Sequence, residues 1–206
     1  MSLDFGKGDI LFEQRLLACA GVYFGKLDGL WGTASRKAAE DALLGYAQLQ
    51  DTFGKYDARS DSNIVTLLPC MQKRARQILQ LGQRWEKDTG LHVSILSGSR
   101  TYAEQDALFS QRPKVTNARG GQSNHNFGIA IDIGLFDQNG KYYTGATQGQ
   151  EKAYIAFAQR VKASVPDIEW GGDWKSIVDA PHFQYKTGLT LAQTRAKFEA
   201  GKLSFP

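Results

Sequence analysis

The stretch Ser123-Asn124-His125-Asn126-Phe127-Gly128-Ile129-Ala130-Ile131-Asp132 joins a polar segment to an apolar one. A spacing of seven residues would return His125 and Asp132 to one helix face, but Gly128 and the β-branched residues after it disfavour a helix. We therefore predict a loop that ends in a strand, with His125 at its mouth and Asp132 inside the strand. Taken alone, this pair also fits an ordinary surface contact between a histidine and a carboxylate.

A second stretch, Asp179-Ala180-Pro181-His182-Phe183, places a carboxylate three residues before a histidine. Pro181 stiffens the backbone just before His182. Together the two stretches offer two imidazoles, one carboxylate close to them and one spare carboxylate. A hydrolytic zinc centre needs three protein ligands, an open position for water and a general base. If the two stretches meet in space, the sequence predicts a metallohydrolase.

Two further segments surround these stretches. Trp170-Gly171-Gly172-Asp173-Trp174 suits a wall that packs closely over a ligand, or else a glycine-rich turn with core aromatics. Ser97-Gly98-Ser99-Arg100-Thr101 follows a short predicted strand. An arginine there can meet a peptide carboxylate or a developing oxyanion, or lie on the surface.

The remaining sequence alternates between helical periodicity and short strands, which predicts an α+β fold with a small antiparallel sheet flanked by helices. The predicted helices cover residues 10–20, 36–49, 65–87, 101–110 and 151–164, and a last helix begins at Thr190. The predicted strands cover residues 93–97, 129–133 and 183–185. Residues 50–63 have weak periodicity and predict a linker or a loosely packed connection.

Composition places the chain among globular proteins. Its 206 residues suffice for one medium or two small domains, and 42% are hydrophobic and 22% charged. The formal net charge of +4 suits an anionic polymer but is too dispersed to indicate nucleic-acid binding. No apolar run is long enough for membrane insertion, and the first residues lack an export signal. Cys19 and Cys70 have no metal-type spacing and predict buried, reduced thiols.

The motifs, taken in order, resemble a known family. Ser-x-His-x-x-Gly-x-Ala-x-Asp, Trp-Gly-Gly-Asp-Trp and Asp-x-Pro-His-Phe are similar to the zinc peptidases of bacterial cell walls, from about Asn63 to Tyr185. That family includes D-alanyl-D-alanine carboxypeptidases, D-Ala-D-Ala dipeptidases and phage endolysins that cut L-alanyl-D-glutamate bonds. Ser-Gly-x-Arg-Thr, the Gln105 that follows it and Val115-Thr116-Asn117-Ala118 extend the resemblance.

The resemblance implies a role for each matching residue. One zinc ion per chain would be held by His125, Asp132 and His182, with Asp179 as the general base. Arg100 would act in catalysis and bind substrate; the further substrate-binding residues would be Gln105, Ser123 and Trp174. The aspartate base and the Trp-Gly-Gly-Asp-Trp segment resemble the L-alanyl-D-glutamate branch. The alternatives are a D-Ala-D-Ala carboxypeptidase or dipeptidase, and a non-catalytic wall-binding structural protein.

The N-terminal segment resembles a three-helix peptidoglycan-binding domain through Glu13-Gln14-Arg15-Leu16 and Leu27-Asp28-Gly29-Leu30-Trp31-Gly32-Thr33. We therefore expect a binding domain at residues 1–52, a linker at 53–62 and a catalytic domain at 63–206. The whole resembles a phage endolysin, which implies a monomer that binds peptidoglycan. Such an enzyme would stay in the host cytoplasm until lysis and then reach the periplasm and cell wall.

Overall fold

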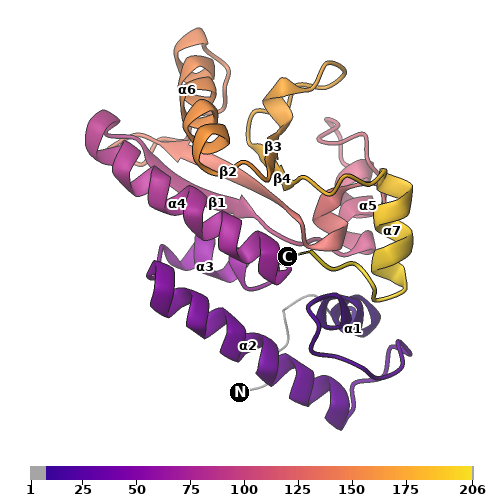
Figure 1. Ribbon diagram of the computed structural model, residues 1–206. Helices are drawn as coiled ribbons and strands as arrows, with labels where there is room; N and C mark the ends of the chain where they lie inside the picture. Colours follow the sequence, from indigo (N-terminus) through magenta and orange to yellow (C-terminus); the bar gives the residue numbers. More distant parts are fainter. Residues whose placement is uncertain (1–7, 206) are drawn as a thin grey trace.

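The computed structural model describes residues 8–205 and has an α+β architecture (Figure 1). Its sheet is antiparallel, with strand order β1-β2-β4-β3. The strands are β1 (His92–Ser97), β2 (Ala130–Phe136), β3 (Ile168–Trp170) and β4 (His182–Tyr185). The helices are α1 (Ile10–Cys19), α2 (Thr33–Phe53), α3 (Ala58–Ile64), α4 (Pro69–Thr89), α5 (Tyr102–Ser110), α6 (Gln148–Ser164) and α7 (Leu191–Glu199), with 3₁₀ turns η1 (Asn124–Phe127) and η2 (Gly171–Asp173). The predicted fold class is confirmed.

The two faces of the sheet have different chemistry. Successive side chains of a strand point to opposite faces, so the fully buried Ile131 and Ile133 enter the core while Asp132 between them faces the other way. Asp132 pairs with His182 across β2 and β4. One face of the sheet is therefore apolar, and the other carries the residues with ligand chemistry.

A bulge adjusts the end of β1. Ile95 pairs with Ile133, but the next pair joins Ser97 to Asp132. Strand β1 therefore advances by two residues where β2 advances by one. A bulge of this kind re-aims the side chains after it. It brings Ser97 beside Asp132, at the point where the chain leaves the sheet toward Arg100.

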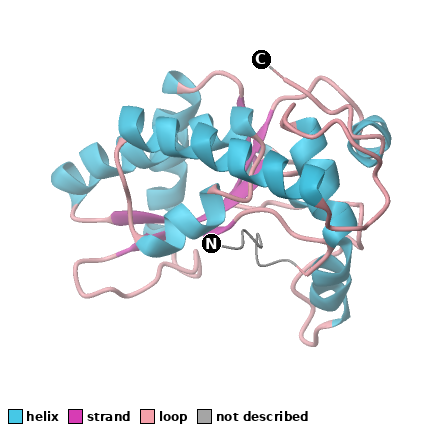
Figure 2. Cartoon of the chain, turned by 90° about the horizontal axis from the view of Figure 1, so that it is seen from below, coloured by secondary structure: helices cyan, strands magenta, loops and turns pink. Residues whose placement is uncertain are grey.

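Helices α4 and α6 cover the apolar face (Figure 1). Ala75, Ile78 and Trp85 of α4 are buried there, and the Trp85 ring lies 5.1 Å from that of Phe157 on α6. Figure 2 shows how much of the fold around this small sheet is helical. Helix α4 begins at Pro69 rather than near residue 65, because proline fits the first helical position and disrupts a helix interior.

Helix α1 packs into the same core as the sheet. The Phe12 ring lies 5.7 Å from that of Phe198 on α7, and Phe198 lies 5.4 Å from Phe127. Leu16 packs so closely on Gly128 that a side chain added there would lie 2.9 Å from its methyl carbon. Helix α1 therefore supports the loop that carries His125.

Gln14 organises the turn after α1. Its Oε1 accepts hydrogen bonds from the backbone N–H of Asp28 and Gly29, at 3.1 and 2.9 Å. Its Nε2 donates to Oδ1 of Asp28 at 3.0 Å and to the Leu30 carbonyl at 3.0 Å. The Asp-Gly motif thus serves to hold the turn. Helices α1 and α2 share a second small core of Leu17, Tyr23, Ala38 and Ala39.

The segment expected to be a linker is structured at both ends. Helix α2 continues to Phe53 and ends at Gly54, whose φ of 85° suits glycine. Helix α3 follows, and its Ser60 Oγ accepts a hydrogen bond from the Ile95 N–H of β1 at 2.8 Å. The third helix of the chain is thus attached to the sheet, and the Tyr46 hydroxyl of α2 also donates to Oδ1 of Asp61 on α3, at 3.2 Å.

Arg76 joins the end of α2 to α4. Its guanidinium is buried, stacks on the Tyr46 ring at 4.8 Å and donates from Nη1 to the Gly54 carbonyl at 2.9 Å. A buried guanidinium is stable only when it is paired in this way. The connection between the N-terminal helices and the rest is therefore packed.

Three smaller expectations concern the chain as a whole. Cys19 and Cys70 are buried and unpaired, as predicted, and burial raises the pKa of each thiol to about 11. Within residues 8–205 no helix has both the length and the apolar character needed to cross a membrane. Residues 1–7, which we expect to carry no export signal, lie outside the described residues.

Candidate metal centre

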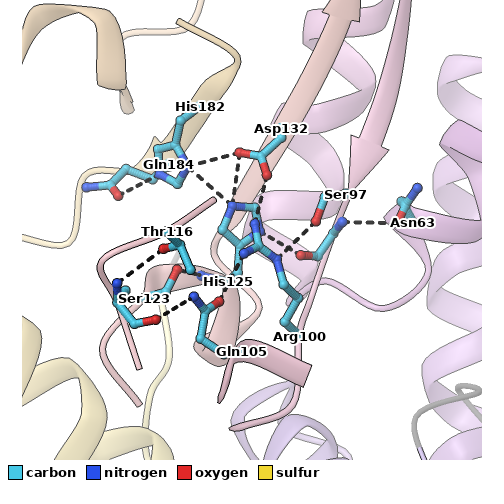
Figure 3. Close-up of polar contacts among 12 residues, drawn as sticks. Asn63, Ser97, Arg100, Gln105, Thr116, Ser123, His125, Asp132, His182 and Gln184 are labelled. Carbon is cyan, nitrogen blue, oxygen red and sulfur yellow. Dashed lines mark hydrogen bonds and ion pairs between the residues drawn. The ribbon is translucent and has the colours of Figure 1, made fainter. Parts of the chain in front are cut away.

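Three elements bring three donor atoms together. His125 comes from η1, Asp132 from β2 and His182 from β4 (Figure 3). The Nε2 atom of His125 lies 3.1 Å from Oδ1 of Asp132 and 3.2 Å from Nδ1 of His182. That Nδ1 atom lies 3.2 Å from the same Oδ1. Within residues 8–205 this is the one group of three such side chains close enough to share a metal ion.

The local sequence around His125 shapes a tight turn. Ser123 caps η1, with its hydroxyl accepting from the His125 N–H at 3.4 Å. Gly128 ends the turn with a φ of 69°, a conformation that glycine adopts without strain. The Arg100 N–H donates to the His125 carbonyl at 3.0 Å, which ties this turn to the end of β1.

Hydrogen bonds fix which nitrogen of each imidazole carries a proton. Nδ1 of His125 lies 2.7 Å from the Gly98 carbonyl, so it donates, and Nε2 keeps its lone pair. Nε2 of His182 lies 3.0 Å from Oε1 of Gln184, and when a neutral ring donates to this oxygen, Nδ1 keeps its lone pair. Both lone pairs face Oδ1 of Asp132. Such outer contacts are typical of histidines that bind metals.

The donor set fits a cation. Two nitrogen lone pairs and a carboxylate oxygen repel one another unless a positive charge lies between them. Ligands about 2.0–2.2 Å from a tetrahedral metal lie about 3.3–3.6 Å apart, only slightly farther than the distances found here. Imidazole and carboxylate donors together suit a divalent transition-metal ion.

Arg100 contacts the outer oxygen of Asp132. Its Nη2 donates to Oδ2 at 2.8 Å, its Nη1 to Oε1 of Gln105 at 2.9 Å and its Nε to Oγ of Ser97 at 3.2 Å. Asp132 thus presents Oδ1 to the imidazoles and Oδ2 to the guanidinium (Figure 3). These contacts engage three of the five guanidinium N–H groups and leave two.

A model of the D-alanyl-D-alanine carboxypeptidase family matches residues 116–185, which include all three donor residues and Asp179. The part of the chain that carries the donor residues is thus similar to this family.

Two similar proteins have more specific names. The peptidoglycan L-alanyl-D-glutamate endopeptidase CwlK of Bacillus subtilis is 39% identical over 105 residues, 46% of this chain and 61% of that relative. The L-alanyl-D-glutamate peptidase of Listeria phage A118 is 28% identical over 130 residues, 63% of this chain and 42% of that relative. The chain thus spans less than two thirds of the length of either relative.

One solved structure is also similar. The Serratia marcescens L-Ala D-Glu endopeptidase ChiX is 25% identical, with a TM-score of 0.48, over 63% of this chain and 88% of that one.

Asp179 is the spare carboxylate beside the donor triangle. It lines the same cleft as His182 and makes no side-chain hydrogen bond to another described residue. Burial and the nearby charge of Asp132 raise the pKa of Asp179 above its usual value. A carboxylate that is unpaired, partly buried and more basic than usual is suited to accept a proton.

The pKa values of the three donor residues are also shifted from their usual values. Burial lowers the pKa of His125. For His182 burial acts in the same direction, but the hydrogen bond to Asp132 and its charge outweigh burial and raise the pKa. Burial opposes ionisation of Asp132, yet the two imidazoles hold its pKa well below the usual range. The carboxylate is therefore ionised over the whole neutral range.

The Trp-Gly-Gly-Asp-Trp segment combines the two roles that the sequence left open. Trp170 is buried and donates from Nε1 to the Ala180 carbonyl at 2.8 Å. The Trp174 ring lies 5.0 Å from that of His182 and lines the cleft. Gly171 cannot carry a side chain, because an added carbon would lie 2.6 Å from the Asp179 carbonyl oxygen. The segment thus holds the loop of Asp179 and His182 and supplies one aromatic wall.

The donor triangle opens into a cleft of about 1060 Å³. Its polar lining includes Arg100, Ser123 and Asp179, and Trp174 and Tyr142 add aromatic surface. Val115 and Ile177 line it as well and are exposed. The cleft is large enough for an extended peptide and has both polar and apolar contacts to offer.

The positions of His92 and Gln105 can be compared with what the sequence predicted for them. His92, to which the sequence gave no role, lies at the start of β1 and contacts Glu86 through Nδ1 at 3.1 Å, outside the donor group. Gln105, expected at the substrate, is fully buried and bonded to Arg100 and to the Ala118 carbonyl. The structure thus places Gln105 behind Arg100 and not in the lining of the cleft.

Sequence reasoning missed the residues that contact the imidazoles from outside. Gly98 was noticed only as part of a motif, yet its carbonyl accepts from His125. Gln184 contacts His182, and Glu169 and Asn124 contact Gln184 in turn. Strand alternation could have indicated Gln184, because a residue two positions after His182 points to the same face.

Proposed function

We propose that this protein is a zinc endopeptidase that hydrolyses the L-alanyl-D-glutamate bond of peptidoglycan stem peptides. The observation that carries the proposal is the triangle of His125, Asp132 and His182 beside the unpaired carboxylate of Asp179, inside a peptide-sized cleft. The names of the two relatives support the choice of bond.

One zinc ion per chain would be held by Nε2 of His125, Oδ1 of Asp132 and Nδ1 of His182. When bound, zinc supplies Lewis acidity, which polarises a carbonyl group and makes a coordinated water more acidic. The raised pKa and free position of Asp179 then suit a general base. Its carboxylate takes the proton of the attacking water and returns it to the leaving amine.

Arg100 has two roles in this proposal. It orients Asp132 through Oδ2, and its remaining N–H groups stabilise negative charge on the carbonyl oxygen of the substrate. Ser123 and Trp174, which line the cleft, contact the stem peptide on either side. Gln105 contributes by holding Arg100 in place.

The test combines chelation with product analysis. Purified full-length protein should release new N-terminal D-glutamate from purified peptidoglycan, lose this activity with a strong chelator and regain it with Zn²⁺. Mass spectrometry of the muropeptides identifies the bond. Activity that persists after complete metal removal would contradict the zinc mechanism.

A second function is favoured by the family description, which is D-alanyl-D-alanine carboxypeptidase. Release of free D-alanine in the same digest would establish that activity in place of the endopeptidase. A third candidate, a wall-binding structural protein with zinc as a brace, predicts no cleavage at all. The unpaired Asp179 speaks against it, because a brace needs no base.

We propose further that residues 1–52 bind peptidoglycan, that 53–62 connect them and that 63–206 carry the catalysis, in a monomer acting at the cell wall after host lysis. The turn held by Gln14 and the exposed Phe24 and Leu30 support the first point. Cross-linking of an inactive Asp179→Asn chain to purified sacculi should give contacts in this segment. Contacts confined to the cleft would contradict a separate binding role, and size-exclusion chromatography with light scattering tests the monomer.

A further inference from the structure

A chain of polar side chains occupies the side of His182 that faces away from Asp132. Oε1 of Gln184 accepts from Nε2 of His182 at 3.0 Å and from Nδ2 of Asn124 at 2.8 Å. The Nε2 group of Gln184 donates to Oε2 of Glu169 at 2.8 Å. Each of these contacts joins a donor to an acceptor, so the network is consistent.

The backbone fixes this arrangement. Gln184 follows His182 by two residues on β4, and both therefore point to the same face of the sheet (Figure 3). Glu169 is the direct cross-strand partner of Gln184 on β3. Asn124 precedes His125 in η1. The network thus links β3, β4 and the His125 turn around one imidazole.

Glu169 determines the direction of the network. A carboxylate only accepts hydrogen bonds, so the NH₂ group of Gln184 must turn toward Glu169. Its carbonyl oxygen must then face His182, and Asn124 donates to the same oxygen. An acceptor at this position requires an N–H at Nε2 of His182, which leaves the lone pair on Nδ1.

We propose that Gln184, oriented by Glu169 and Asn124, is a positioning residue that keeps Nδ1 of His182 unprotonated and directed at the metal. This inference rests on the zinc site of the proposed function. An amide in this place supplies the acceptor without adding a charge next to Asp132 and Asp179, while the carboxylate of Glu169 acts only through it.

Zinc affinity provides the first test. Zn²⁺ alone is titrated into the full-length protein against a chromophoric chelator, for the wild type, Gln184→Met and Glu169→Gln. Methionine keeps the length of the side chain but offers no comparable acceptor, so the Kd for Zn²⁺ should rise about 10- to 100-fold. Gln148→Met, at the exposed start of α6, is the matched control and should leave the Kd unchanged.

The tautomer of His182 provides a second test that needs no metal. At a pH where the metal-free imidazole is neutral, ¹⁵N chemical shifts of the wild type should favour the form with the proton on Nε2. In Gln184→Met they should shift toward the form with the proton on Nδ1, which lies 3.2 Å from Oδ1 of Asp132. Glu169→Gln should shift the mixture in the same direction, because its amide no longer forces the orientation of Gln184. It also serves as the second variant if Gln184→Met does not fold.

Exchanging the amide of Gln184 with the carboxylate of Glu169 provides the third test. Gln184→Glu alone sets two carboxylates 2.8 Å apart and should weaken zinc binding. The double variant Glu169→Gln/Gln184→Glu restores an amide beside a carboxylate and should recover the affinity, which a purely structural loss would not. A wild-type Kd and tautomer in Gln184→Met would overturn the inference. If the wild type binds no Zn²⁺, the proposed function fails, and the tautomer measurement still decides the role of Gln184.

Discussion

Arg100 donates from Nη2 to Oδ2 of Asp132 across 2.8 Å, while Oδ1 of that carboxylate faces both imidazoles. The Asp132 carboxylate therefore links the Arg100 guanidinium to the donor atoms proposed for the metal. Asp132 and Arg100 are both largely shielded from water, with side-chain exposures of 23% and 16%. The pair should consequently contribute more than an exposed ion pair does.

The first prediction follows from this pair. Arg100→Met leaves a shielded carboxylate without its charged donor, so the free energy of unfolding of the metal-free protein should fall by about 1.5–3 kcal/mol. Urea denaturation measures this change. Arg160→Met is the control: its pair with Asp88 is exposed at 3.4 Å, and its loss should change stability by about 0–1 kcal/mol. Equal effects of both substitutions would contradict the assigned role of Arg100.

Asp179→Asn should separate metal binding from turnover. The substitution removes the proposed base, so kcat should fall by about 10²-fold or more. Zinc stoichiometry should remain near one per chain, because Asp179 lies outside the donor triangle. Metal analysis of the purified variant provides the check. A variant that has lost its zinc would make Asp179 a ligand instead of a base.

The same substitution should not destabilise the metal-free protein at neutral pH. Folding raises the pKa of Asp179, so the folded state favours the protonated form. Stability therefore falls as pH rises from the unfolded value of about 3.9 through the raised folded value. The asparagine side chain of the variant has no charge to bury, and the Tm at pH 7 should be equal to or above that of the wild type. A clear decrease in Tm would contradict the conclusion that burying the ionised Asp179 carboxylate lowers the stability of the wild type.

The acid limb of the activity profile should reflect the same group. Asp179 acts as a base only when ionised, so kcat/KM should fall as pH decreases through the pKa of its carboxyl in the zinc-loaded enzyme, which burial raises and the charge of the metal lowers. Protonation of the metal ligands could produce a similar loss. Zinc occupancy is therefore measured at each pH, and the limb should appear while occupancy is still complete. A limb that coincides with zinc release would assign it to the ligands.

Packing between α1 and the His125 turn gives the last prediction. Leu16 is 4% exposed and lies against Gly128, so Leu16→Ala should lower the free energy of unfolding by about 2–5 kcal/mol. Ile10 on the same helix is 37% exposed, and Ile10→Ala should cost much less. Denaturant midpoints of the two variants check this difference. Equal midpoints would show that α1 does not support the core.

Several features could be predicted from the sequence because they follow local rules. Gly128 and the β-branched residues after it predicted the change from loop to strand, and β2 lies there. The helix predicted from residue 101 begins at Tyr102, where Thr101 and Glu104 form a capping box. The short strands and flanking helices predicted the fold class. Asp132 and His182, named from their motifs, are brought together by one antiparallel register.

Other features depend on contacts between distant segments, which local patterns do not contain. The partner of Arg100 is a carboxylate 32 positions away, and the bulge that aims Ser97 is a property of the paired strands. Phe12 belongs to an apolar helix face in any fold, but only the tertiary structure shows that it packs on Phe198. The burial of Gln105 likewise depends on how the chain around Ala118 folds over it.

The sharing of one core by α1 and the His125 turn limits how this protein can be recombined. A chimera that joins residues 53–206 to a foreign targeting cassette would remove Phe12 and Leu16 and uncover Phe198. Exposed apolar surface of this kind promotes aggregation. Engineers who wish to redirect the protein to another surface should therefore graft new loops onto the exposed turn around Phe24 and keep α1 in place.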